Sequence, residues 1–263
     1  MVINKHFLKI IIGSIPFILI IIGWSAISFF NFVPNWLLPS PINTFRTFFL
    51  LIVDKTIPSL ILVSAINALP ALAAAFISAV ILGLAIGSSN TIRKMFLPFM
   101  SAVYPIPSLA WLPLIIIFVG FTRWAIWIVV FMAVFIRVIY VIVDGVRSID
   151  KHFIMVARNF GYTHLEVLFK VVLPASLPAV ITGARLGFGS AWRSLIGAEM
   201  LVVSLGGLGK FIWFSQWYYS FDKVFAGILT ISIIGIIIEQ LILRTLEKKT
   251  LELWGVHDVI YKP

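Results

Sequence analysis

The segment Val156–Val180, VARNFGYTHLEVLFKVVLPASLPAV, interrupts a chain that is otherwise almost entirely apolar. It carries several charged side chains, a glycine at Gly161 and prolines at Pro174 and Pro178. Of the 263 residues, 61% are hydrophobic and 11% are charged, less than half the usual charged share of a soluble domain. Because a soluble fold of this size could not bury so much apolar surface, we predict an all-α polytopic membrane protein.

The apolar sequence falls into runs long enough to cross a membrane. A bilayer core of about 30 Å is crossed by about 20 apolar helical residues. Six runs meet this length and predict six transmembrane helices, at 8–30, 66–89, 96–120, 124–143, 176–203 and 224–243. The third run contains four prolines, so we expect it to be kinked or split into half-helices. The first run is too long for the apolar part of a signal peptide, and we interpret it as a span.

The link between the first two runs contains Pro34, Pro39 and Pro41, which exclude a continuous helix there. From Ile42 onward the apolar residues recur at helical spacing, which predicts either an interfacial helix or a buried amphipathic helix of the bundle. The predicted regions are a first transmembrane helix with an outer interfacial segment at 1–65, a core transmembrane domain at 66–248 with a loop at 148–174, and a tail at 249–263.

The net charge of +10 would suggest a nucleic-acid partner in a soluble protein. Here the charges lie in short clusters between apolar runs, which indicates membrane orientation and no nucleic acid. With the N-terminus inside, the inner segments hold twelve Lys and Arg residues and the outer segments hold five. This excess predicts that both termini, and the loop at 148–174, face the cytoplasm.

The loop is predicted to contain two short helices. Asp150 can cap a helix that runs to Phe160, and Gly161 stands where a left-handed residue would end it. Thr163 and Glu166 have the spacing of a capping box at the start of the second helix. The first helix is too apolar for a cytoplasmic surface, so it either binds a partner or folds back on the ends of its own spans.

Pro174 closes the loop and either ends the second helix or kinks its entry into the fifth span. The loop as a whole resembles the E-A-A-x3-G-x9-I-x-L-P loop in permease subunits of bacterial ABC importers. The match includes Ala157, Gly161 and the Leu173–Pro174 pair, whereas Met155 and Val156 replace the leading Glu and Ala. The residues that this resemblance implies for contact with an ATPase are Phe153, Met155, Val156, Ala157, Phe160, Gly161, Leu173 and Pro174.

Four further segments, WLLPSP, YPIPSLAWLPLIIIFVG, AWRSLIGAEM and GGLGKFIW, resemble the nitrate, taurine and aliphatic-sulfonate branch of these permeases. The resemblance implies a type I importer permease in the bacterial inner membrane. It implies a cytoplasmic ATPase that binds ATP and Mg, an external solute-binding protein and a second permease copy. The implied substrate is a small anion such as a sulfonate, taurine or nitrate, although related permeases carry vitamin-like heterocycles.

Charged and aromatic residues inside the apolar runs are candidates for a substrate pathway. An unpaired charge at mid-bilayer costs about 2.5–3.5 kcal/mol on insertion scales, so Arg193 and Glu199 should face protein, water or each other. Tyr104 and Trp111 lie in the proline-broken third run, where irregular backbone can line a cavity. Each of the four residues could instead have a structural role, in ion pairing, packing or a kink.

The chain lacks recognisable catalytic motifs. GGLGK at 206–210 is not a phosphate loop, and the four histidines lack metal-ligand spacing. We therefore expect no enzyme, no metal site and no cofactor in this chain. An autonomous secondary transporter or channel is the alternative, and it would transport without ATP.

Overall fold

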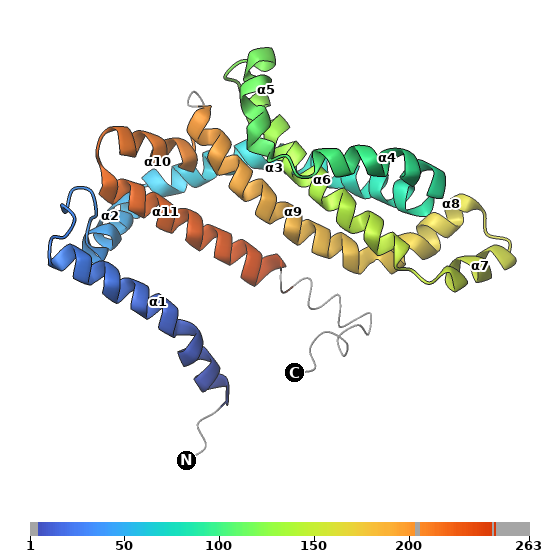
Figure 1. The fold of residues 1–263 in the computed structure, drawn as a ribbon, viewed down its shortest axis with the longest axis horizontal. Helices are drawn as coiled ribbons and strands as arrows, with labels where there is room; N and C mark the ends of the chain where they lie inside the picture. The colour runs from blue at the N-terminus through green and yellow to red at the C-terminus, as the bar shows by residue number, and fades with distance from the viewer. Residues whose placement is uncertain (1–4, 203–205, 244, 246–263) are drawn as a thin grey trace. The chain divides into compact units, whose positions relative to one another are not determined.

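The computed structural model describes residues 5–202, 206–243 and 245, and every regular element in that part of the chain is helical (Figure 1). This confirms the predicted all-α fold. The predicted tail at 249–263 lies outside the described residues. The elements are α1 (Lys5–Phe29), α2 (Pro41–Val53), α3 (Thr56–Ser88), α4 (Asn90–Val103), η1 (Ser108–Trp111), α5 (Leu112–Val119), α6 (Arg123–Arg147), α7 (Lys151–Asn159), α8 (His164–Val167), η2 (Leu168–Val172), α9 (Leu173–Leu201), α10 (Leu208–Trp217), α11 (Phe221–Ile236) and η4 (Ile237–Leu243).

Four helices are long and apolar enough to cross a bilayer, at Thr56–Ser88, Arg123–Arg147, His164–Leu201 and Phe221–Gln240. A fifth candidate combines α4 with the η1–α5 segment. The stretch Gly13–Phe29 of α1 is apolar but shorter than the others. The structure therefore supports four or five of the six predicted spans, and the first span stays a prediction.

The third predicted span is broken, as its prolines indicate. The α4 and η1–α5 helices meet at an angle of 81°. Pro105 and Pro107 lie in the break, where a proline cannot donate a helical hydrogen bond and its ring crowds the preceding turn. The short 3₁₀ turn η1 then leads into α5. The break places irregular backbone against α6 and α9, where a cavity is found.

The chain divides into two compact units. One holds the described residues up to Ser59 together with Phe211–Ile231. The other holds Leu60–Lys210 together with the described residues from Ser232 onward. The predicted domain limits at 65/66 and 248/249 stay predictions.

In the first unit, aromatic and polar contacts join α1, α2 and α11. The Trp24 ring stacks on Phe225 with centroids 5.4 Å apart, and its indole Nε1–H donates to the carbonyl of Pro39 at 2.8 Å. The Thr47 hydroxyl donates to the Asp222 carboxylate at 3.0 Å.

The helix expected from Ile42 onward is α2. The side chain of Ser40 caps it by accepting the backbone N–H of Asn43 at 3.2 Å. Phe49 and Val53 are exposed on its surface. An amphipathic helix with an exposed apolar face favours the interfacial interpretation over burial in the bundle.

In the second unit, α6 and α9 pack side by side along most of their lengths (Figure 1). Glycines on both helices permit this close approach. A Cβ atom at Gly187 would lie 2.7 Å from Cγ2 of Val138, and one at Gly145 would lie 2.1 Å from Cβ of Ala179. The small-residue pair Gly183 and Gly187 therefore serves packing within the subunit.

This packing predicts an asymmetry between neighbouring glycines of α9. Gly187→Ala forces a methyl group into Val138, and such overpacking typically costs about 1–3 kcal/mol. Gly189→Ala is the matched control, because its nearest neighbour would be an Arg193 guanidinium nitrogen at an ordinary 3.7 Å. We expect thermal unfolding in detergent to show a lower Tm for Gly187→Ala only. Equal Tm values for the two variants would contradict the glycine-mediated contact.

Candidate functional site

The first helix of the loop at 148–174 is α7, and it begins as the sequence predicts. The Asp150 carboxylate accepts the backbone N–H of His152 at 2.8 Å, which satisfies one of the free donors at the helix start. The helix is only nine residues long. Phe153 in the helix and Phe160 directly after it are 62% and 79% exposed, whereas Ala157 is buried against the core.

Gly161 ends α7 in a left-handed conformation, with φ +83°. Its backbone N–H donates to the carbonyl of Arg158 at 2.9 Å, and the next N–H, of Tyr162, donates to Ala157 at 3.2 Å. This pair of bonds is a Schellman motif. No atom lies within 4 Å of a Cβ built on Gly161, so the conformation, rather than crowding, requires glycine. The predicted elbow is confirmed.

The second helix begins with the predicted capping box. The Thr163 hydroxyl accepts the N–H of Glu166 at 3.3 Å, and the Glu166 carboxylate accepts the N–H of Thr163 at 3.0 Å. Lys170 forms an ion pair with Glu166 at 2.9 Å. The Thr163 backbone N–H, followed by Lys170, lowers the pKa of Glu166 to about 2. The carboxylate is therefore charged at neutral pH.

Pro174 does not end the second helix, so that alternative is wrong. α8 passes through the π turn η2 directly into α9, and His164–Leu201 forms one run of 38 residues. Pro174 stands in the first turn of α9, where the wider π turn before it accommodates the missing N–H. A helix of this length extends about 57 Å, nearly twice a bilayer core, so part of it lies outside that core.

The eight predicted ATPase-contact residues separate into three groups in the structure. The exposed ones are Phe153, Met155, Val156 and Phe160. Gly161 forms the elbow. Ala157 is buried, while Leu173 and Pro174 are half-buried at the start of α9. Only the first group offers an apolar surface to a partner.

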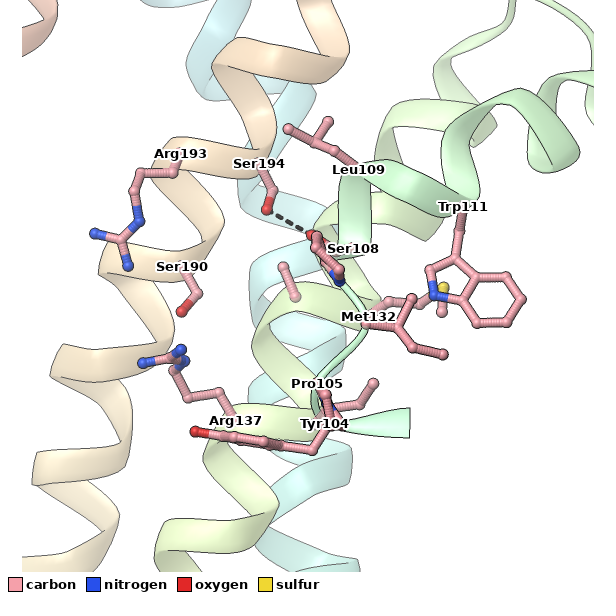
Figure 2. Close-up of a pocket in the computed structure, with 14 residues that line it drawn as sticks. Tyr104, Pro105, Ser108, Leu109, Trp111, Met132, Arg137, Ser190, Arg193 and Ser194 are labelled. Atoms are coloured by element: carbon pink, nitrogen blue, oxygen red, sulfur yellow. Dashed lines mark hydrogen bonds between the residues drawn. The ribbon is translucent and has the colours of Figure 1, made fainter. Parts of the chain in front are cut away.

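Three of the four predicted pathway residues line one cavity of about 340 Å³ (Figure 2). Tyr104 and Trp111 come from the broken third span, and Arg193 comes from α9. The remaining wall includes Arg137 of α6 and three serines, Ser108, Ser190 and Ser194. The hydroxyls of Ser108 and Ser194 are hydrogen-bonded at 2.8 Å, which joins η1 to α9.

Two arginines line the cavity. Figure 2 shows Arg137 and Arg193 on the same side of the cavity with Ser190 between them. Within the part of the chain that the structure describes, neither arginine has a carboxylate partner. Sequence reasoning did not place Arg137 on the pathway, although a charge inside the apolar run 124–143 was a usable signal. The arrangement suits an anionic ligand.

Glu199 lies outside this cavity, in a buried hydrogen-bond network. Its side chain has no exposed surface. It accepts hydrogen bonds from the Ser64 hydroxyl at 2.9 Å, the Asn67 amide at 2.9 Å and the backbone N–H of Gly209 at 3.0 Å. The Ser64 oxygen also accepts the N–H of Leu208 at 2.9 Å. These contacts indicate a structural role.

No group of three or more metal-ligating side chains occurs among the described residues. The cavity lined by Arg137 and Arg193 offers cationic side chains, which suit the binding of an anion.

Known proteins resemble this chain in both sequence and fold. The taurine transport system permease protein TauC of Escherichia coli (strain K12) is 35% identical over 68% of this chain and 64% of its own length. The putative aliphatic sulfonates transport permease protein SsuC of Bacillus subtilis (strain 168) is 31% identical over 90% of this chain and 85% of its own length. The chain thus spans less than two thirds of the first of these relatives.

The solved structure of the MetNI methionine ABC transporter in inward-facing conformations shares the fold. It matches with a TM-score of 0.59 and 15% identity, over 74% of this chain and 98% of the matched chain. Residues 79–250 match the family described as "Binding-protein-dependent transport system inner membrane component". This match covers more than half of the chain, and the chain therefore belongs to that family of inner-membrane transport components.

Proposed function

We propose that this chain is the permease subunit of an ATP-driven importer for a small anion, such as a sulfonate, taurine or nitrate. The observation that carries the proposal is the cavity with two guanidinium groups, Arg137 and Arg193, which lack carboxylate partners among the described residues. Family membership and the relatives named for taurine and aliphatic sulfonates support it. The chain itself moves the substrate and performs no chemistry on it.

The cavity is suited to transient binding of an oxyanion. Guanidinium groups donate paired N–H bonds that match the oxygens of a sulfonate or nitrate. The hydroxyls of Ser108 and Ser194 are bonded to each other, which leaves one O–H free to donate to an anion, while the Ser190 O–H donates to the carbonyl of Leu186. The wall formed by the proline-broken third span supplies irregular backbone, which membrane proteins tolerate where it lines a cavity. Binding of moderate strength at such a site lets an anion enter and leave.

The cytoplasmic loop is proposed to dock onto an ATPase subunit. The exposed side chains of Phe153 and Phe160 form an apolar surface on α7, and burial of one phenylalanine contributes about 1.5–3 kcal/mol. The Gly161 elbow fixes the direction in which α7 projects from the long helix that starts at His164. ATP and Mg would be bound by that ATPase.

The remaining partners are also proposals. An external binding protein would deliver the anion, and a second copy of the chain would enclose the other side of the path. The exposed Arg193 at the cavity edge supports an enclosing partner. The excess of Lys and Arg in the predicted inner segments supports cytoplasmic termini.

The first test removes one cationic group from the cavity. Arg193→Gln should lower anion uptake by about 10- to 100-fold, because a hydrogen bond to a charged group contributes roughly 1.5–3 kcal/mol. Assembly with the ATPase should persist. Uptake of labelled taurine, sulfonate and nitrate in liposomes measures the effect.

Arg185→Gln is the matched control on the same helix, since Arg185 lies near Glu239 at 3.8 Å and outside the cavity. The Arg185→Gln variant should retain anion uptake if it assembles with the ATPase. If the Arg193→Gln complex assembled normally and imported all three anions at the wild-type rate, the cavity would not be part of the transport pathway.

The second test separates the loop from its ATPase. Phe153→Asp should abolish co-elution of the ATPase and ATP-driven uptake together, because it removes an apolar contact and places a charge in the docking cleft. The membrane bundle should still insert. His152→Asp is the control, since it adds the same charge to an exposed neighbouring position and leaves Phe153 in place.

Retention of ATPase binding and uptake by Phe153→Asp would exclude this residue from the coupling contact. Uptake by the wild-type chain without any ATPase would instead identify an autonomous secondary transporter.

A further inference from the structure

A second cavity, of about 970 Å³, lies beneath the cytoplasmic loop. Its walls come from the end of α3, the start of α4, the end of α6, and from α7, α8 and η2. We call it the loop cavity. It is lined by α7 and by the ends of the spans, and it shares no residue with the cavity of Arg137 and Arg193. Neither the proposed transport pathway nor the proposed ATPase contact uses it.

The loop cavity is strongly basic. Its cationic lining residues are Arg93, Arg147, Lys151 and Arg158, and His164 also faces it. None of its lining residues is acidic. Among the described residues, the one ion pair to a lining residue is weak, since Asp144 approaches Arg147 at 3.8 Å and both side chains are largely exposed.

The helix dipoles around the loop cavity do not change its positive charge. The N-termini of α4 and α7 and the C-termini of α3 and α6 all reach it, so their dipoles offset one another. The side-chain charges therefore decide what binds there, and they favour a ligand with more than one negative oxygen.

The other half of the lining is apolar. It includes side chains from the spans and from the loop, such as Val146, Ile154, Val167 and Leu168. A free inorganic anion gains nothing from such walls, whereas an amphiphile gains from both halves. The cavity also lies where α3 ends at Ser88 and α6 ends at Arg147, the depth at which lipid headgroups meet cytoplasm.

We propose that the loop cavity binds an anionic phospholipid, with its phosphate on the basic side chains and its glycerol and first acyl carbons on the apolar wall. The bound lipid would bridge Arg93 of α4 to Lys151 and Arg158 of α7. It would thereby hold α7 in a fixed position against the ends of the spans. The inference goes beyond the proposed function, because it holds whichever substrate the chain transports.

The test compares two adjacent basic residues. Arg93 lines the loop cavity and Lys94 does not, yet Arg93→Gln and Lys94→Gln remove the same charge from the same turn of α4. The full chain in detergent is titrated with phosphatidylglycerol, with phosphatidylcholine or with inorganic phosphate, and bound ligand is counted by native mass spectrometry. Each titration is repeated with the ATPase bound.

We expect wild type to retain one phosphatidylglycerol per chain, with and without the ATPase, and to retain phosphatidylcholine more weakly. Arg93→Gln should weaken phosphatidylglycerol binding by about five- to tenfold, while Lys94→Gln should leave it unchanged.

Three results would overturn the proposal. Equal weakening by Arg93→Gln and Lys94→Gln would indicate general surface charge. Binding of inorganic phosphate as tight as that of phosphatidylglycerol would indicate a free-anion site. Loss of the lipid when the ATPase binds, with Arg93→Gln also weakening ATPase co-elution, would assign the basic residues to the protein interface.

Discussion

The buried carboxylate of Glu199 joins three elements at one point. α9 carries it, α3 donates to it through Ser64 and Asn67, and the start of α10 donates through the backbone of Gly209. Removing one partner of a buried polar group leaves an unsatisfied atom that costs about 1–3 kcal/mol. The carboxylate therefore fixes the end of α9, and with it the register of the cavity residues one to three turns earlier.

The turn that covers this carboxylate has little freedom. Gly206 and Gly207 both have positive φ angles, +80° and +103°. Any Cβ at Gly207 would overlap the Glu199 carboxylate. The GGLGK sequence at 206–210, which has the appearance of a nucleotide motif, therefore serves to bring a backbone N–H onto a buried acid.

Local chemistry made the loop at 148–174 predictable from the sequence. The Asp150 cap, the Gly161 elbow and the Thr163–Glu166 box depend on contacts across at most five residues, so their spacing alone identifies them. The Glu199 network was not predictable, because its donors at Ser64 and Asn67 are 135 and 132 residues distant in the chain. Tertiary packing decides such contacts.

The same distinction between local and long-range contacts explains which other features could be predicted from the sequence. The break in the third span followed from prolines within it, whereas the approach of Arg137 to Arg193 required the packing of α6 on α9. The path of the chain through Pro174 depended on a π turn, for which the residues of η2 carry no sequence signal. The serines that line the cavity of Arg137 and Arg193 could not be predicted either, since a lone serine in an apolar helix often bonds to its own backbone.

The uninterrupted run from His164 to Leu201 has a mechanical consequence. It connects the elbow at Gly161 with Arg193 through a single rod, and the 27 residues between Glu166 and Arg193 correspond to about 40 Å of helix. A rod does not absorb displacement along its length as a hinged pair of helices would. A displacement of the loop would therefore be carried along this helix toward Arg193. The π turn of η2 and the prolines Pro174 and Pro178 are the places where the helix departs from regular geometry.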